Sequence, residues 1–255
     1  MTSTIPAGSP VWIDMTSSNF PAAQAFYQQL FGWKFEDVGN YHVFSLDGHP
    51  LGALTATDPN HQPAYPGAID QWTVFLHSDN LPDTITRALA AGGEVLLPET
   101  TVYDWGRFAV LADPDRAIVG VWQPGTHAGF GHHNKKRGSL AHDYPCWFEI
   151  MNRKFAESIE FYRSAFHWDI HRATGEWNYT TNAPPESATC GLGDITGVFA
   201  DDAPAWFRVY FQVDNVDAAV ATVRELGRTL DDAPPIPLMV ALLPSLIPVG
   251  QNFKF

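Results

Sequence analysis

Trp12-Ile13-Asp14-Met15, followed by Phe26-Tyr27 and Phe31-Gly32-Trp33, is the stretch of sequence that decides the fold, because the chain contains this pattern twice. The second copy stands at a constant offset of 135 residues and reads Trp147-Phe148-Glu149-Ile150, Phe161-Tyr162 and Phe166-His167-Trp168. Each copy is long enough to enclose its own hydrophobic core, unlike the short units of a solenoid repeat. The sequence therefore predicts duplicated domains, and function has to be sought at paired positions.

The composition is that of an acidic globular protein. The 255 residues are 45% hydrophobic and 17% charged, with a formal net charge of -13. Proteins that bind phosphate backbones or anionic membranes carry a basic patch, and the only basic run, Lys135-Lys136-Arg137, is short. We therefore expect neither nucleic acid nor a membrane as a partner.

The N-terminal sequence shows no targeting signal, and no segment approaches the roughly 20 apolar residues of a membrane span. These features predict a cytoplasmic protein. The two cysteines, Cys146 and Cys190, read as small buried hydrophobic residues and not as a disulfide framework.

Hydrophobic periodicity and turn residues predict the same order of elements in both copies, a strand, a helix and three strands, twice over. In the first copy, Asn19 is the expected N-cap of a helix that ends at Gly32, and Asp47-Gly48 is a strong hairpin signal. The segment from Gln123 to Tyr144 is rich in Gly and His. We assign residues 1–123 to a first domain, 124–144 to a linker and 145–255 to a second domain.

The four predicted β-α-β-β-β units, with Phe-Tyr and Phe-Gly-Trp closing the first helix and Asp113-Pro114 closing the second hairpin, resemble the glyoxalase, bleomycin-resistance and extradiol dioxygenase superfamily. Within that superfamily, the chain resembles tandem actinobacterial glyoxalase-like proteins, which include a mycobacterial culture-filtrate antigen. The resemblance implies an α+β fold of two tandem glyoxalase-like domains. In each, paired βαβββ modules would form curled sheets around a cavity that holds the ligand.

The same resemblance implies where a metal would be held in members that use one: a His or Gln on the first strand, a second ligand on the fifth strand and a Glu on the last. Counting from the shared motifs puts other residue types at these positions: Trp12, Thr73 and Gly120 in the first copy, and Trp147, Arg208 and Lys254 in the second. None is a usual metal ligand, so the sequence predicts no metal and no other cofactor. Trp12, Thr73, Trp147 and Arg208 are predicted to contact a ligand instead.

Strand parity places Asp14 on the same face as Trp12, and Glu149 on the same face as Trp147. Each cavity would then hold one indole and one carboxylate, a pair that suits a flat or apolar ligand with a cationic or hydrogen-bonding head. Such a carboxylate, Asp14 or Glu149, is also a candidate general base. The alternative is that both tryptophans belong to the core and both carboxylates pair with backbone or with Arg208.

Other polar clusters give weaker signals. Tyr103 and Trp105 precede a strand and are predicted either to cover the first cavity as a lid or to pack as an ordinary turn. The linker histidines, His127, His132, His133 and His142, are predicted to be solvated, because a flexible segment holds no fixed ligand geometry.

The segment from Pro235 to Pro248 breaks the repeat, since it reads as a Pro-interrupted apolar run where the first copy has the strand from Trp105 to Pro114. If the reading frame is shifted back by one base, the codons of residues 236–248 can encode Asp-Ser-Pro-Tyr-Gly-Arg-Val-Ala-Thr-Val-Thr-Asp-Pro. That sequence resembles the first copy. We therefore hypothesise two compensating frame slips around residues 236–248. The alternative is an authentic apolar segment, which would leave the second cavity rewired and favour a homodimer contact.

Three functions compete at this point. The first is a metal-independent protein that sequesters a hydrophobic or aromatic small molecule, as bleomycin-resistance members do. The second is a lyase or isomerase of the glyoxalase I type that uses Asp14 or Glu149 as general base. The third is an interaction protein similar to the antigen, for which no residue gives direct support.

Overall fold

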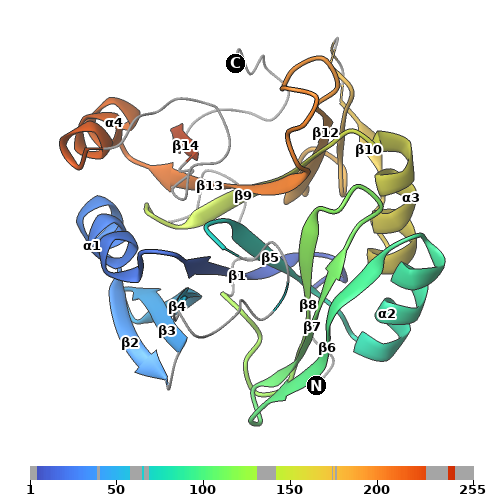
Figure 1. Cartoon of the computed structure of the whole chain (residues 1–255), viewed down its shortest axis with the longest axis horizontal. Coiled ribbons are helices and arrows are strands. Elements are labelled where there is room, and N and C mark those ends of the chain that lie inside the picture. The colour runs from blue at the N-terminus through green and yellow to red at the C-terminus, as the bar shows by residue number, and fades with distance from the viewer. Residues whose placement is uncertain are drawn as a thin grey trace.

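The fold grows from the strand that carries Trp12, which lies at the centre of the first of two sheets in the computed structural model (Figure 1). The structure describes residues 5–38, 41–57, 65, 69–130, 142–173, 175, 177–227 and 241–244. The first half comprises β1 (Pro10–Ser17), α1 (Phe20–Phe31), β2 (Lys34–Val38), β3 (Tyr41–Leu46), β4 (His49–Ala56), β5 (Trp72–His77), α2 (Leu81–Ala90), β6 (Glu94–Val102), β7 (Gly106–Ala112) and β8 (Ile118–Pro124). The second half comprises β9 (Pro145–Asn152), α3 (Phe155–Phe166), β10 (His171–Arg172), β11 (Tyr179–Thr181), β12 (Cys190–Asp194), β13 (Trp206–Val213), α4 (Val216–Glu225) and β14 (Ala241–Pro244). Among the helices described, none is both long and apolar enough to cross a lipid bilayer.

Helix α1 forms where the sequence predicts it. The Asn19 side chain accepts a hydrogen bond from the backbone N–H of Ala22, and the helix buries its periodic apolar side, including Phe26 and Tyr27. Gly32 ends the helix in the left-handed conformation at φ 68°, where its N–H bonds to the Gln28 carbonyl. The predicted cap, apolar face and stop are therefore confirmed.

The turn between β3 and β4 also follows the prediction. Asp47 and Gly48 have φ values of 50° and 78°, and two positive φ values in succession give the tight turn whose twist matches a hairpin. This turn sets β3 beside β4, which itself pairs with β1. Tyr41 is thereby brought to the sheet face that carries Trp12.

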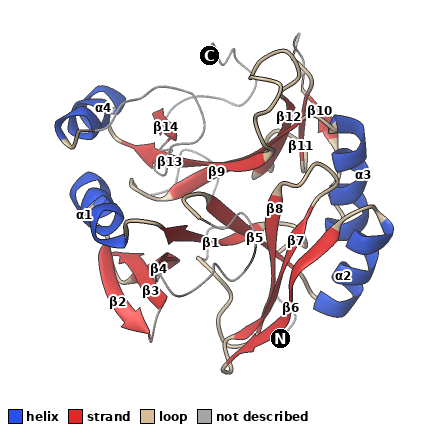
Figure 2. Cartoon of the chain, in the orientation of Figure 1, coloured by secondary structure: helices blue, strands red, loops and turns tan. Residues whose placement is uncertain are grey.

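Two β-α-β-β-β modules share the first sheet, whose strand order is β2-β3-β4-β1-β5-β8-β7-β6 (Figure 2). Within each module the first strand pairs in parallel with the last, β1 with β4 and β5 with β8. The modules meet where β1 pairs antiparallel with β5, in a register that sets Trp12 against Phe75 and Asp14 against Thr73. The α+β fold of curled sheets built from such modules is thus confirmed.

The second sheet repeats this plan only in part, with strand order β10-β11-β12-β9-β13-β14. Strand β14 pairs in parallel with β13, Tyr210 opposite Ala241, just as β8 pairs with β5 in the first sheet. The repeat predicts that this segment matches β7, whereas β14 pairs as β8 does. The remaining residues of the proposed frame slip, 236–240 and 245–248, and the expected last strand, 249–255, lie outside the described part.

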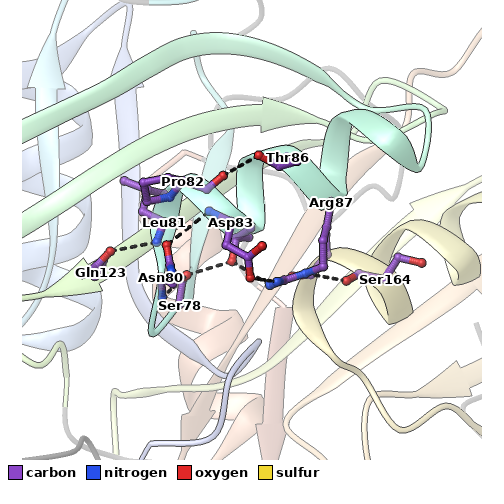
Figure 3. Close-up of polar contacts among 11 residues, drawn as sticks. Ser78, Asn80, Leu81, Pro82, Asp83, Thr86, Arg87, Gln123 and Ser164 are labelled. Carbon is purple, nitrogen blue, oxygen red and sulfur yellow. Dashed lines mark hydrogen bonds and ion pairs between the residues drawn. The ribbon is translucent and has the colours of Figure 1, made fainter.

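The two halves pack against each other through helices and through one continuous core. Helix α2 contacts α3 and α1 contacts α4, at opposite ends of the molecule (Figure 1). Figure 3 shows Arg87 of α2 directed at α3, where its Nε donates to the Ser164 carbonyl at 2.9 Å. Between the sheets, Phe211 packs against Phe31 and Trp33, with ring centroids 4.9 and 5.5 Å apart. The halves therefore form a single packed body.

Candidate functional site

The Trp-x-acid pattern forms a hydrogen-bonded pair in both halves. Trp12 Nε1 donates to Asp14 Oδ1 at 2.7 Å, and Trp147 Nε1 donates to Glu149 Oε1 at 3.1 Å. Both pairs lie on the first strand of a module, β1 and β9, where residues two apart share a face. The structure therefore brings each predicted indole and carboxylate together.

A tyrosine that the sequence analysis missed completes each pair. Tyr41 on β3 donates to Asp14, with its hydroxyl 2.5 and 2.6 Å from the two carboxylate oxygens, and Tyr179 on β11 donates to Glu149 Oε1 at 2.8 Å. The two tyrosines are 138 residues apart, not 135, because the preceding connections differ in length. A search at one constant offset could not pair them.

The concave face of the first sheet encloses a cavity of about 610 Å³ with Asp14 in its wall. Most of the lining is aromatic or aliphatic, from both modules and from the segment that follows β8. The lining residues are Trp12, Asp14, Glu36, Val38, Tyr41, Val43, Pro50, Phe75, Val102, Tyr103, Trp105, Phe108, Trp122, Thr126, His127 and Gly129. A space of this size holds a drug-sized molecule.

Three further predicted residues of the first half lie in or near this cavity. Tyr103 and Trp105 line it, with ring centroids 5.7 Å apart, and Tyr103 is 77% exposed at a φ of 47°. Thr73 lies beside Asp14 on the neighbouring strand but is buried, and its hydroxyl is 2.9 Å from that of Tyr65. Tyr103 and Trp105 therefore belong to the lining of the cavity, whereas Thr73 does not.

His127 corrects the prediction that the linker histidines are solvated. It is half-buried, lines the cavity and meets Trp12 edge to face at a centroid distance of 5.1 Å. Burial lowers the pKa of its imidazole below the usual value of 6.5. The segment is held in place because Trp122 Nε1 donates to the His127 carbonyl and Phe130 N–H donates to the Val11 carbonyl. His132 and His133 lie outside the described residues.

The environment of Asp14 raises its pKa to about 7. The main cause is burial, which disfavours the charged carboxylate. Hydrogen bonds from Tyr41, Trp12 and the Ala53 backbone act in the opposite direction, because they stabilise the ionised form. Asp14 can therefore change protonation state near neutral pH, which is the property required of a general acid or base.

In the described part of the second half, protein side chains surround the matching carboxylate, Glu149. Glu149 is only 2% exposed, and Tyr210 donates to its second oxygen, Oε2, at 2.6 Å. Arg208, buried beside Tyr210, donates to the Tyr210 hydroxyl at 3.4 Å. Tyr179 lies so close over Gly191 that a Cβ there would be 1.7 Å from its hydroxyl. The geometry thus gives Trp147, Glu149 and Arg208 packing partners within the protein.

The positions that hold a metal in some members of the resembling superfamily do not offer metal ligands here. The Trp12 indole N–H is a donor only, and a Cβ at Gly120 would lie 2.3 Å from the Phe75 ring, which leaves no room for a glutamate. Within the described ranges, no three His, Cys, Asp or Glu residues are grouped so that they could bind an ion. Lys254 lies outside those ranges. The residues present in the first cavity therefore do not fit a divalent cation.

Comparison with known proteins agrees with this architecture. The chain is 32% identical over 246 residues to the anthracycline biosynthesis protein DnrV of Streptomyces peucetius, covering 89% of this chain and 85% of that protein. It is 28% identical over 231 residues to the "Putative glyoxylase CFP32" of Mycobacterium tuberculosis, covering 86% and 83%. The Mn(II)-bound glyoxalase from Novosphingobium aromaticivorans has a similar fold, with a TM-score of 0.55 and 14% identity, covering 88% of this chain and 71% of that one.

A family model matches residues 9–120, which span β1 to β8. The chain belongs to the Glyoxalase/Bleomycin resistance protein/Dioxygenase superfamily.

Proposed function

We propose that this protein binds a flat, hydrophobic or aromatic small molecule in its first cavity without the help of a metal ion. The observation that carries the proposal is the lining of the cavity, where several aromatic rings surround the carboxylate of Asp14. Phe75, Phe108 and Trp122 offer ring faces and edges to a planar ligand, and such contacts add to the free energy gained by burying apolar surface.

Two further observations support this function. The cavity volume of about 610 Å³ lies within the range of about 300–1,000 Å³ that suits drug-sized molecules. In addition, the relatives DauV and DnrV are named for the biosynthesis of anthracyclines, compounds with a planar fused-ring body. The absence of suitable ligands at the metal positions supports binding that does not depend on a metal.

Binding of a neutral aromatic probe, 9-hydroxymethylanthracene, tests the proposal. We expect its fluorescence to report saturable binding that is unchanged by EDTA. Trp105→Ala should weaken this binding about tenfold, because it removes an aromatic wall, whereas Trp177→Ala in the second half, the matched control, should not. Binding that is lost in EDTA and restored by Mn²⁺ would contradict metal independence. Equal losses of probe affinity in both variants would contradict the location of the binding site in the first cavity.

A second candidate function is proton transfer by Asp14 in a lyase or isomerase reaction. The observation that favours it is the pKa of Asp14, about 7, in a cavity large enough for a substrate. Conversion of methylglyoxal and glutathione to lactoylglutathione, followed in EDTA, tests it. Asp14→Asn should abolish turnover and Glu149→Gln should leave it intact, since Glu149 is enclosed by protein side chains. Turnover that survives in Asp14→Asn would rule out this base.

The homodimer and the cytoplasmic location predicted from the sequence remain predictions, which sedimentation and cell fractionation would test.

A further inference from the structure

The wall of the first cavity is chemically divided. Its two acidic side chains, Asp14 on β1 and Glu36 on β2, both come from the first module. Most of its aromatic rings come from the second module and from the segment after it, on β5, β7 and β8 and in the loop that carries Trp105. A ligand that fills this space would therefore place one end near carboxylates and its body among aromatic rings.

Among the described residues of the lining, no Lys or Arg balances these acids. The one histidine among them is His127, and burial lowers the pKa of its imidazole, which disfavours the charged form. Lys34, two residues before Glu36 on β2, is exposed and does not contribute to the lining. Arg107 on β7 is paired with Glu99 at 2.6 Å. The electrostatic field inside the cavity is consequently set by acidic groups.

The comparison between the two halves shows that Asp14 has capacity left for a ligand. In the second half, Tyr210 donates a hydrogen bond to Glu149 Oε2 at 2.6 Å. Phe75 occupies the corresponding place in the first half, opposite Trp12 as Tyr210 is opposite Trp147. Phenylalanine has no hydroxyl to donate, and Asp14 instead accepts hydrogen bonds from Trp12, Tyr41 and the Ala53 backbone. The two oxygens of a carboxylate have about four acceptor sites between them, so a donor on a bound molecule can be added to these three.

We infer that the first cavity selects aromatic ligands that carry a cationic amine at one end, and that it discriminates against ligands that carry a carboxylate there. This inference rests on the proposed function and specifies its ligand class. The ammonium group would donate to Asp14 with Glu36 nearby, while the rings of the ligand pack against Phe75, Phe108 and Trp122. A carboxylate in the same place would meet like charge and would find no cationic partner.

Three anthracenes that differ in a single substituent test this selectivity: 9-aminomethylanthracene, which is cationic, 9-hydroxymethylanthracene, which is neutral, and anthracene-9-carboxylate, which is anionic. Binding is measured by probe fluorescence at pH 8, where most of Asp14 is ionised, and at one fixed ionic strength. We expect the amine to bind about tenfold or more tightly than the alcohol, and the carboxylate to bind more weakly than either.

A pair of charge-matched variants separates the cavity from the overall negative charge of the protein. Glu36→Gln should weaken binding of the amine about two- to fivefold and leave the alcohol unchanged, because Glu36 is exposed and solvent screens its charge. Glu186→Gln removes the same charge from an exposed loop in the second half and should change neither. Equal losses in the two variants would overturn the assignment of selectivity to this site.

The pattern across the three probes also distinguishes the inference from the proposed function. Equal affinity for all three, or tightest binding of the carboxylate, would overturn the charge selectivity and leave aromatic binding in place. Failure of every probe to bind would overturn both.

Discussion

At the scale of single residues, Asp14 and Glu149 hold equivalent positions in the two halves, and one hydroxyl group distinguishes their surroundings. Both accept hydrogen bonds from a tryptophan and a tyrosine of their own half. Glu149 receives a further bond from the Tyr210 hydroxyl, whereas Asp14 receives one from the Ala53 backbone and lines the cavity of the first half. The same motif is therefore buried in the second half and lines a cavity in the first.

Tyr41→Phe tests what sets the pKa of Asp14. The Tyr41 hydroxyl stabilises the ionised carboxylate, so its removal should raise the Asp14 pKa further above 7, by about one unit. The pH dependence of amine-probe binding, or an NMR titration of Asp14, measures this shift. Tyr179→Phe, the equivalent change in the second half, is the control and should leave the titration unchanged. An Asp14 pKa that falls in Tyr41→Phe would contradict the assigned role.

His77→Gln tests a source of acid sensitivity. His77 on β5 is fully buried, with its ring 3.8 Å from Asp79, and burial lowers its pKa below 6.5. The folded state then resists protonation, so stability is full above about pH 6.5 and falls as pH decreases below it. Gln212 holds the same position in the second half, which suggests that glutamine fits there. Urea unfolding at pH 7.5 and at pH 5 measures the effect. Between these pH values, the free energy of unfolding should fall less in His77→Gln than in the unchanged protein.

At the scale of elements, the pairing of β5 with β8 depends on Gly120. This residue lies opposite Phe75, and a Cβ there would be 2.3 Å from the Phe75 ring. Gly120→Ala should therefore cost about 1–3 kcal/mol of unfolding free energy and should weaken probe binding by displacing Phe75 into the cavity. Phe75→Leu in the same chain should recover part of both losses, as a double-mutant cycle would measure. Simple additivity of the two changes would contradict the clash.

Strand β14 does not test the proposed frame slip, which remains a prediction about the gene. We expect the coding DNA to show one inserted and one deleted base around codons 236–248 when it is compared with related genes. The intact mass of protein made from verified DNA should then differ from that of the printed sequence. A related gene that encodes Leu238-Met239-Val240-Ala241-Leu242-Leu243 without any such change would disprove the hypothesis.

At the scale of the whole molecule, a buried carboxylate joins the two halves. Asp113, at the turn after β7, accepts hydrogen bonds from the Ala117 N–H at 2.8 Å and from the Ser158 hydroxyl of α3 at 3.0 Å. Burial raises the pKa of Asp113 to about 6. The folded state therefore holds this proton more tightly than the unfolded chain, and the contribution of Asp113 to stability falls as pH rises from about 4 to 6.

Ser158→Ala tests this junction. It removes a donor that stabilises the ionised carboxylate, so it should raise the Asp113 pKa and cost about 1–2 kcal/mol at pH 7.5. The cost should be smaller at pH 5, where most of Asp113 is protonated. Urea unfolding at the two pH values measures both. Ser164→Ala, a change at a residue that contributes only its backbone carbonyl to Arg87, is the control and should show no pH dependence.

The sequence by itself determined the local elements and the repeat. Asn19, Gly32 and Asp47-Gly48 act through their own backbone and nearest neighbours, so helix α1 and the β3–β4 turn could be predicted without a structure. The spacing of Trp12 and Asp14 on one strand likewise determined that both face the same side. Such inferences succeed because they depend on contacts a few residues apart.

Only the tertiary structure decided the surroundings of each of the two repeated carboxylates. That outcome depends on Tyr210 in place of Phe75, on Tyr179 crossing Gly191, and on His127 folding back over Trp12. These contacts join residues that are distant in the chain, and loops of unequal length bring them together. The pKa of Asp14 follows from the same packing, because burial by several separate strands, and no property of the motif itself, raises it.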